Sequence, residues 1–263
     1  MLQCAAFVGT WMALGWLLPV DETGYLLLGV PLTVLFQLGV RRRPLTALWV
    51  RDPPRSRLGR RGAVVAAVLA VAPGVFLVER VAAGDWAGTA WMTAALGGAV
   101  AAGYSLQQAA AARTARAAVP ATVVGTAVMG LVLGIGLVRQ GYLAAPVLDG
   151  LTTAALSLAL YLPVAFVLEE VTFRGLLDSH VHHVGEPRGV ASALLVSASW
   201  GLWHLPVTDA DVPLAAQGVG LVVVHCLIGV PLSLAWRRSG NLAAPAAAHA
   251  VVDAVRNGLQ AVV

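Results

Sequence analysis

The chain has 263 residues, of which 59% are hydrophobic and only 11% are charged, and its mean hydropathy is +0.80. A soluble globular protein carries about 25% charged residues, so this composition excludes an ordinary soluble domain and indicates that lipid surrounds most of the chain. The net charge is +4 and all seventeen basic residues are arginine. These arginines lie between apolar stretches, as membrane topology requires, so we expect no nucleic-acid partner.

Nine apolar runs follow one another along the chain, and a membrane helix needs about 20 such residues. The runs are 2–20, 24–40, 62–79, 86–112, 117–138, 151–170, 189–206, 212–236 and 241–259. The run at 189–206 is short and rich in serine and glycine, which makes the expected number of membrane helices eight or nine. The sequence therefore predicts an all-α fold, a polytopic transmembrane helical bundle.

The placement of arginine predicts the orientation, because arginine-rich loops stay in the cytoplasm. Loop 41–61 contains a single acid, Asp52, and eight arginines: Arg41, Arg42, Arg43, Arg51, Arg55, Arg57, Arg60 and Arg61. Counting the spans onward puts further arginines on this side, namely Arg113, Arg116, Arg174, Arg188, Arg237 and Arg238. The other side receives Asp21, Glu22, Asp85, Asp149, Asp209 and Asp211. We therefore expect a multi-pass protein of the cell membrane with the loop 41–61 inside.

Three polar groups interrupt the last apolar runs, namely Glu169-Glu170 with Arg174, then His204, and then His249 with Asp253. Charged side chains are costly within a membrane span, so they indicate a functional site by default. Glu170 and Arg174 are four residues apart and can pair on one helix face, which leaves Glu169 free to face a cavity. The structural alternatives are a charged helix end for the Glu pair, an interfacial role for His204, and a packing role for His249.

Depth within the membrane predicts that these groups meet. If residues 151–183 form one helix and 189–206 returns antiparallel, Glu169 and His204 lie roughly 21 Å and 22 Å from the turn between them. His249 lies about 12 Å into its own helix from the same side, so the three groups meet if the turn projects about 10 Å beyond the membrane surface. A kink at Pro163 would disturb this alignment.

A glutamate and two histidines in a partly dry cavity suit hydrolysis. Glutamate can take a proton from water, and histidines can bind zinc or stabilise an oxyanion. A zinc site made of Glu169, His204 and His249 would leave one position open for water. The H-E-x-x-H and G-x-S-x-G motifs are absent.

The remaining histidines and cysteines are interpreted as structural. His225 lies in an apolar run and is expected to be a hydrogen-bonded core residue. The cluster His180, His182 and His183 is expected to be solvated, with adventitious metal binding as the alternative. Cys4 and Cys226 lie in separate runs and are expected to be buried free thiols.

The three polar motifs resemble those of the CPBP family of intramembrane proteases, the CAAX protease and bacteriocin-processing group, also called the Abi family. The family motif E-E-x-x-x-R is matched by residues 169–174. Its motif F-x-x-x-H is matched by residues 200–204, with Trp200 in place of Phe. Its motif H-x-x-x-N is matched by residues 249–253, with Asp253 in place of Asn.

The resemblance implies a role for each matched residue. Glu169 would be the water-activating base, working with His204. His249 and Asp253 would act on the transition state or on a metal, and Glu170 and Arg174 would support the site. Family members are described as metalloproteases, yet a glutamate mechanism without obligatory metal is also argued, so zinc is left open.

We thus expect residues 1–149 to form N-terminal membrane helices and residues 150–263 to form the catalytic core of one integral membrane domain. The expected function is hydrolysis of a peptide bond in a hydrophobic or lipid-modified peptide or protein, with the site open to the cytoplasm. The partners are that substrate and the lipid bilayer. The alternatives are a non-catalytic immunity or scaffold protein and a proton-coupled transporter.

Overall fold

The computed structural model describes all residues except 54–56, 141–146, 184, 187–188, 209–211 and 262–263, and the described residues form helices and no strand. The predicted all-α class is confirmed. The main α-helices are α1 (Leu2–Leu17), α2 (Glu22–Leu27), α3 (Gly29–Leu35), α4 (Arg60–Ala82), α5 (Trp86–Gln107), α6 (Ala111–Gln140), α7 (Val147–Ala165), α8 (Ser179–Val181), α9 (Val190–Trp203), α10 (Leu214–Ser239) and α11 (Ala243–Gln260). Arg55, Arg188, Asp209 and Asp211 lie outside the described residues.

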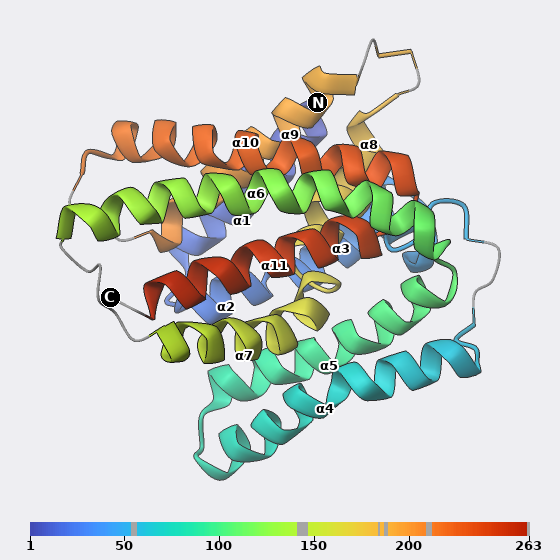
Figure 1. Ribbon diagram of the computed structural model, residues 1–263. Helices are drawn as coiled ribbons and strands as arrows, with labels where there is room; N and C mark the ends of the chain where they lie inside the picture. The colour runs from blue at the N-terminus through green and yellow to red at the C-terminus, as the bar shows by residue number, and fades with distance from the viewer. Residues whose placement is uncertain (54–56, 141–146, 184, 187–188, 209–211, 262–263) are drawn as a thin grey trace.

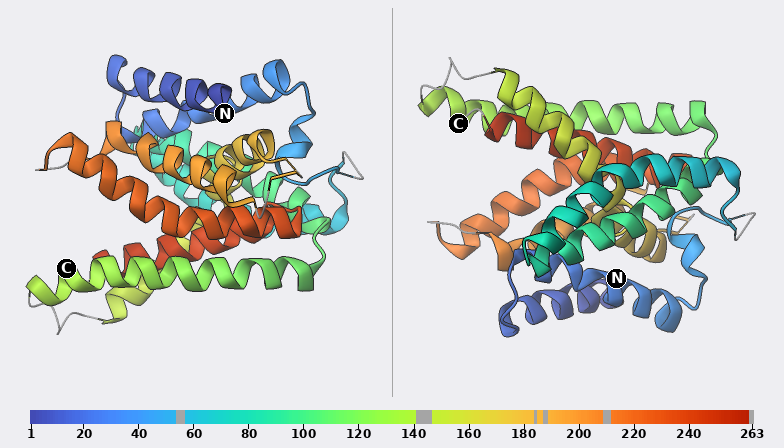
Figure 2. Two further views of the ribbon diagram at one scale, coloured as in Figure 1. Left: turned by 90° about the horizontal axis from the view of Figure 1, so that it is seen from above. Right: turned by 90° about the horizontal axis from the view of Figure 1, so that it is seen from below.

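The long helices pack into one bundle around α11. Helix α11 packs against α6 and α7, while α10 packs against α6 and α9 (Figure 1). Helices α4 and α5 form an antiparallel hairpin at one edge of the bundle. Helices α1 to α3 lie along the side of the bundle opposite α6 (Figure 2). The division of the chain at residue 149 stays a prediction.

Six segments among the described residues are long and apolar enough to cross a membrane, so the expected number of eight or nine is too high. These are Glu22–Val40, Arg60–Ala82, Ala111–Ile135, Leu148–Ala165, Val190–Val207 and Leu214–Ser239. The other three predicted runs do form helices, but α1 is short, α5 is diluted by glycine and threonine, and α11 carries ionisable groups. A helix enclosed by its neighbours does not need an apolar surface all round, which is why α11 can be polar.

Exposed side chains mark the surface that faces lipid. On α4 the valines Val64, Val68, Val71, Val75 and Val78 recur at helical spacing, and each is more than half exposed. A row of this kind would be costly in water and is stable against lipid tails. With six candidate spans, this surface identifies a multi-pass membrane protein.

The helix that carries the Glu pair is broken, so the expected continuous helix over 151–183 is wrong. Helix α7 ends at Ala165, just after Pro163, and the chain resumes as the π-helix η3 (Val171–Asp178). The indole nitrogen of Trp49 donates a 2.7 Å hydrogen bond to the Phe166 carbonyl in the break. Single π-turns within helices occur frequently at functional sites.

Buried ion pairs close the arginine-rich end of the bundle. Arg237 donates to Asp178 at 2.6 Å and 2.9 Å, and to the Ser192 hydroxyl at 2.8 Å. The carboxylate of Glu186 accepts hydrogen bonds from the Ser192 hydroxyl and, at 2.7 Å, from the Ser192 backbone N–H, and these bonds lower the pKa of Glu186 to about 2. These contacts fix the turn between α8 and α9 against α10.

Candidate active site

The break after α7 turns Glu169 toward the end of α9. The carboxylate Oε2 of Glu169 lies 3.9 Å from Nε2 of His204. The same oxygen accepts a 2.7 Å hydrogen bond from the indole N–H of Trp200. Both side chains are about a quarter exposed, at 24% for Glu169 and 23% for His204. One side of the pair is therefore open at the surface of the protein, while protein covers the other side.

A second set of groups forms a row of alternating charge. Arg174 and Glu170 pair at 3.1 Å, and both side chains are completely buried. Glu170 lies 3.0 Å from Nδ1 of His249, whose Nε2 lies 3.4 Å from Asp253. Asp253 in turn pairs with Arg256 at 3.2 Å. Each carboxylate of this row lies between two basic groups, which offsets the cost of burying it.

The indole of Trp200 joins the two sets. The Arg174 guanidinium lies 4.3 Å from the centre of this ring, in a cation–π arrangement. The rings of His249 and His225 lie 5.1 Å and 4.6 Å from it, both edge-on. Trp200 thus separates the buried charged row from Glu169 and supplies Glu169 with a hydrogen-bond donor.

The hydrogen bonds of His204 determine which ring nitrogen is free. Its Nδ1 lies 2.9 Å from the Trp200 carbonyl, which only accepts, so Nδ1 carries the hydrogen. In the neutral ring, Nε2 is then an acceptor that faces Glu169. Nδ1 of His225 makes the same kind of bond to the Leu221 carbonyl, at 2.7 Å, and its ring centre lies 4.4 Å from that of His204.

Exposure rises steadily along the charged row, away from the arginine-rich end of the bundle. The side chains are 0% exposed at Glu170, 7% at His249, 9% at Asp253 and 35% at Arg256. The start of α11 is tied to the arginine-rich loop by a hydrogen bond from Leu242 to Trp49, so this gradient runs toward the C-terminal end of α11.

The residues suggested for zinc do not form a metal site in this arrangement. Both ring nitrogens of His249 face carboxylates, so neither is available to a metal. Within the described part of the chain, no group of three or more His, Cys, Asp and Glu side chains could hold a metal ion. His180, His182 and His183 are among these described residues, and they do not form such a group either. Zinc stays a prediction from the family resemblance.

The structure brings all six of the predicted site residues together, although their roles stay predictions. It adds three groups that the sequence reasoning did not assign to the site: the indole of Trp200, His225 and Arg256. His225 is hydrogen-bonded as expected, yet it also lies beside His204. The signal that identified His204, a histidine inside an apolar run, was equally present at His225. Arg256 follows Asp253 by three residues, a spacing that favours an ion pair.

Residues 151–255 match a family model described as Rce1-like, type II CAAX prenyl endopeptidase Rce1-like. The match begins within α7 and ends within α11, so it contains every site residue except Arg256. No curated protein and no solved structure matches the chain. The family resemblance drawn from the three motifs is thereby confirmed for this part of the chain.

Proposed function

We propose that this protein, whose residues 151–255 match the model of the Rce1-like family of type II CAAX prenyl endopeptidases, cleaves a peptide bond within the membrane by activating water between Glu169 and His204. The single observation that carries the proposal is the 3.9 Å separation of Glu169 Oε2 and His204 Nε2. At this separation one water molecule can donate a hydrogen bond to each of the two acceptors.

The reaction follows from this placement. Glu169 takes a proton from water, and the water oxygen attacks the carbonyl carbon of the scissile peptide bond. The C–N bond then breaks, and the proton held on Glu169 passes to the leaving amine. The indole N–H of Trp200 holds Glu169 Oε2 in position through both steps. No metal takes part in any step of this proposal.

The charged row supports Glu169 in this proposal. His249 faces Glu170 with Nδ1 and Asp253 with Nε2, and it attracts both carboxylates through N–H groups only as the doubly protonated cation. Asp253 accepts but cannot donate, unlike the asparagine of the family motif, and it holds Arg256 instead. Arg256 is the exposed cation of the row and can meet the negative charge that develops on the substrate carbonyl.

The depth of the site supports a hydrophobic substrate. His225, next to His204, lies 11 residues after the start of α10 and 14 residues before its end. At the helical rise these distances are about 16 Å and 21 Å, which supports a site within the depth of the bilayer. We propose a hydrophobic or lipid-modified peptide, since only an apolar segment enters at this depth at low cost.

We propose that the substrate enters from a different side of the membrane than the sequence predicts. The exposure gradient from Glu170 to Arg256 favours an opening at the C-terminal end of α11. The arginine-rich loop lies at the other end of the bundle, and arginine marks the cytoplasmic side. We therefore propose an opening on the outer face of the cell membrane, in place of the expected opening to the cytoplasm.

Thiol labelling tests this orientation without any assay of cleavage. Thr208, exposed beyond His204, is replaced by Cys, and Arg116, exposed at the arginine-rich end, is replaced by Cys as the matched control. Both variants carry Cys4→Ala and Cys226→Ala. A membrane-impermeant maleimide added to intact cells should label position 208 and spare position 116 until the cells are permeabilised. The opposite pattern would return the opening to the cytoplasm.

Cleavage by the purified protein tests the function. The full chain in lipid nanodiscs is given a library of hydrophobic peptides, with and without a lipid modification, and the products are identified by mass spectrometry. Wild type should cleave, whereas Glu169→Gln should bind the same peptides and leave them intact. Binding without cleavage by both proteins would support the non-catalytic alternative. Equal cleavage by both would refute the role of Glu169.

A further inference from the structure

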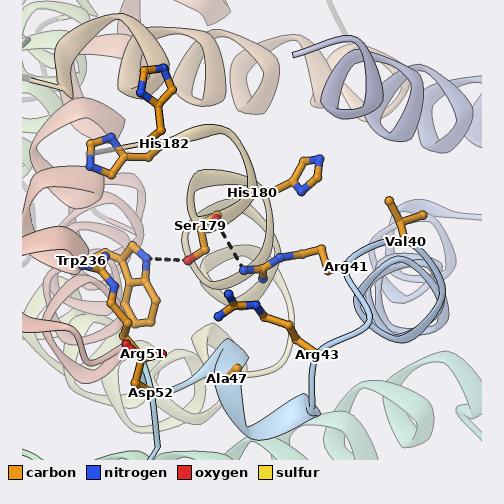
Figure 3. Close-up of a pocket in the computed structure, with 11 residues that line it drawn as sticks. Val40, Arg41, Arg43, Ala47, Arg51, Asp52, Ser179, His180, His182 and Trp236 are labelled. Atoms are coloured by element: carbon orange, nitrogen blue, oxygen red, sulfur yellow. Dashed lines mark hydrogen bonds between the residues drawn. The ribbon is translucent and has the colours of Figure 1, made fainter. Parts of the chain in front are cut away.

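A polar cavity of about 560 Å³ lies at the arginine-rich end of the bundle, away from the proposed active site (Figure 3). Its walls come from the π-helix η1 (Phe36–Val40), the loop that follows it, helix α8 and the end of α10. Three arginines and three histidines line it, against one acid: Arg41, Arg43, Arg51, His180, His182, His183 and Asp52. Cavities of about 300–1,000 Å³ are typical of sites for small ligands.

The positive charge of this cavity is not neutralised by the protein. None of Arg41, Arg43 and Arg51 forms an ion pair with an acid of the described residues. Asp178 already binds Arg237, and Glu186, which lies 3.3 Å from Nδ1 of His182 at the edge of the cavity, already binds Ser192. With neutral histidines, three arginines and Asp52 leave a net charge of +2 in the cavity.

The arginines have distinct roles in building the cavity. Arg41 is held by the Gln37 side chain at 2.9 Å and by the Gly175 carbonyl at 3.2 Å. Burial and the charge of Arg43 lower the pKa of Arg41 to about 10, as expected for two unpaired cations held together. Arg43 projects into the cavity beside Arg41 (Figure 3). Arg51 lies over the Trp236 ring at 5.6 Å, which leaves its N–H groups available to an anion.

The cavity continues into the surface that faces lipid. Val40 lines the cavity and is 45% exposed, and Leu38 and Leu35 extend this exposed apolar surface back along the same helical segment. This segment is part of the candidate span Glu22–Val40. An acyl chain can therefore lie along it while the headgroup of the same lipid enters among the arginines.

We propose that this cavity binds the phosphate headgroup of an anionic phospholipid from the leaflet at the arginine-rich end. Arg43 and Arg51 contact the phosphate through their positive charges, which no acid of the described residues neutralises. Arg41 is committed to the protein and sets the shape of the cavity. Basic pockets between membrane helices bind anionic headgroups in this way. The proposal does not depend on proteolysis.

Native mass spectrometry of the full chain in a non-ionic detergent tests the proposal by titration with phosphatidylglycerol, phosphatidylcholine and inorganic phosphate. The wild type should retain phosphatidylglycerol in preference to phosphatidylcholine. Arg43→Gln/Arg51→Gln should weaken phosphatidylglycerol binding by roughly tenfold or more, since each arginine near the headgroup contributes. The matched control Arg116→Gln removes an exposed arginine at the same end, outside this cavity, and should bind as the wild type does.

The control variant, the competition with inorganic phosphate and a lysine variant can each overturn the proposal. Equal loss in Arg116→Gln would show that binding follows overall charge instead of this cavity. Displacement of phosphatidylglycerol by inorganic phosphate at similar concentration would make the cavity a site for a free anion. Arg43→Lys/Arg51→Lys keeps both charges, so it should retain the lipid preference. Loss of that preference in the lysine variant, in a protein that still unfolds cooperatively, would contradict recognition of the phosphate by its charge.

Discussion

Replacing Arg174 by methionine should destabilise the protein through the charge that it leaves behind. Arg174 is completely buried, pairs with Glu170 at 3.1 Å and lies over the Trp200 ring at 4.3 Å. Removing one partner of a buried ion pair costs about 3–5 kcal/mol. Glu170 keeps His249 at 3.0 Å, so we expect the lower limit, about 3 kcal/mol.

The unfolding temperature reports this loss. At about 2–4 °C per kcal/mol for a chain of this size, Arg174→Met should lower the Tm by about 6–12 °C. The double variant Glu170→Gln/Arg174→Met leaves no unpaired carboxylate and should cost less than the sum of the two single variants. The assay is intrinsic tryptophan fluorescence during heating in detergent. A loss below about 1 kcal/mol for Arg174→Met, or strict additivity in the double variant, would refute the coupling of these buried charges.

Two further predictions concern the closed end of the bundle and the packing beneath the site. The pKa of Glu186 is lowered to about 2, so its contribution to stability is complete above its usual pKa and is lost as the pH falls from about 4.3 toward 2. The protection factor of the Ser192 amide in hydrogen exchange should therefore fall over that range in the wild type and not in Glu186→Gln, and a flat wild-type profile would contradict this. A Cβ at Gly98 would lie 2.0 Å from the Pro163 carbonyl, whereas one at Gly97 would meet nothing within 4 Å. Gly98→Ala should thus cost about 1–3 kcal/mol and Gly97→Ala close to none, and equal Tm values for the two variants would argue against this close approach of α5 and α7.

The helices could be predicted from the sequence because the apolar runs contain few charged residues and are separated by polar or charged segments. All nine runs form helices, and the polar residues inside the last of them do meet. The number of spans was overestimated because an apolar run alone does not distinguish a helix that faces lipid from one enclosed by its neighbours. Helix α11 is the example, since α6 and α7 enclose it and it carries His249 and Asp253.

The features that depend on distant contacts could not be predicted. The break before Glu169 depends on Pro163, which is visible in the sequence, but also on a hydrogen bond from Trp49, 117 residues away from Phe166. The substitution of tryptophan for phenylalanine at position 200 was visible, yet its bond to Glu169 follows only from the way α9 faces the break.

The proposed direction in which the site opens likewise rests on the structure and not on the sequence. The sequence predicted that Glu169 and His204 lie at one depth. It did not indicate at which end of the bundle the side chains are buried and at which end they are exposed. The proposal rests on burial, because Arg237 and Asp178 form a buried pair at the arginine-rich end, whereas Arg256 at the other end of the charged row is 35% exposed. The cavity around Arg43 is a similar case, because its walls come from segments far apart in the chain.

The most direct test of the central claim is a kinetic cycle with Glu169→Gln, His204→Ala and the double variant, each measured with the same cleaved peptide. If the two side chains activate one water molecule, removing either abolishes the same step. The kcat of the double variant should then lie within a few-fold of the slower single variant. Independent losses that multiply in the double variant would mean that Glu169 and His204 do not share a water molecule, and would contradict the account.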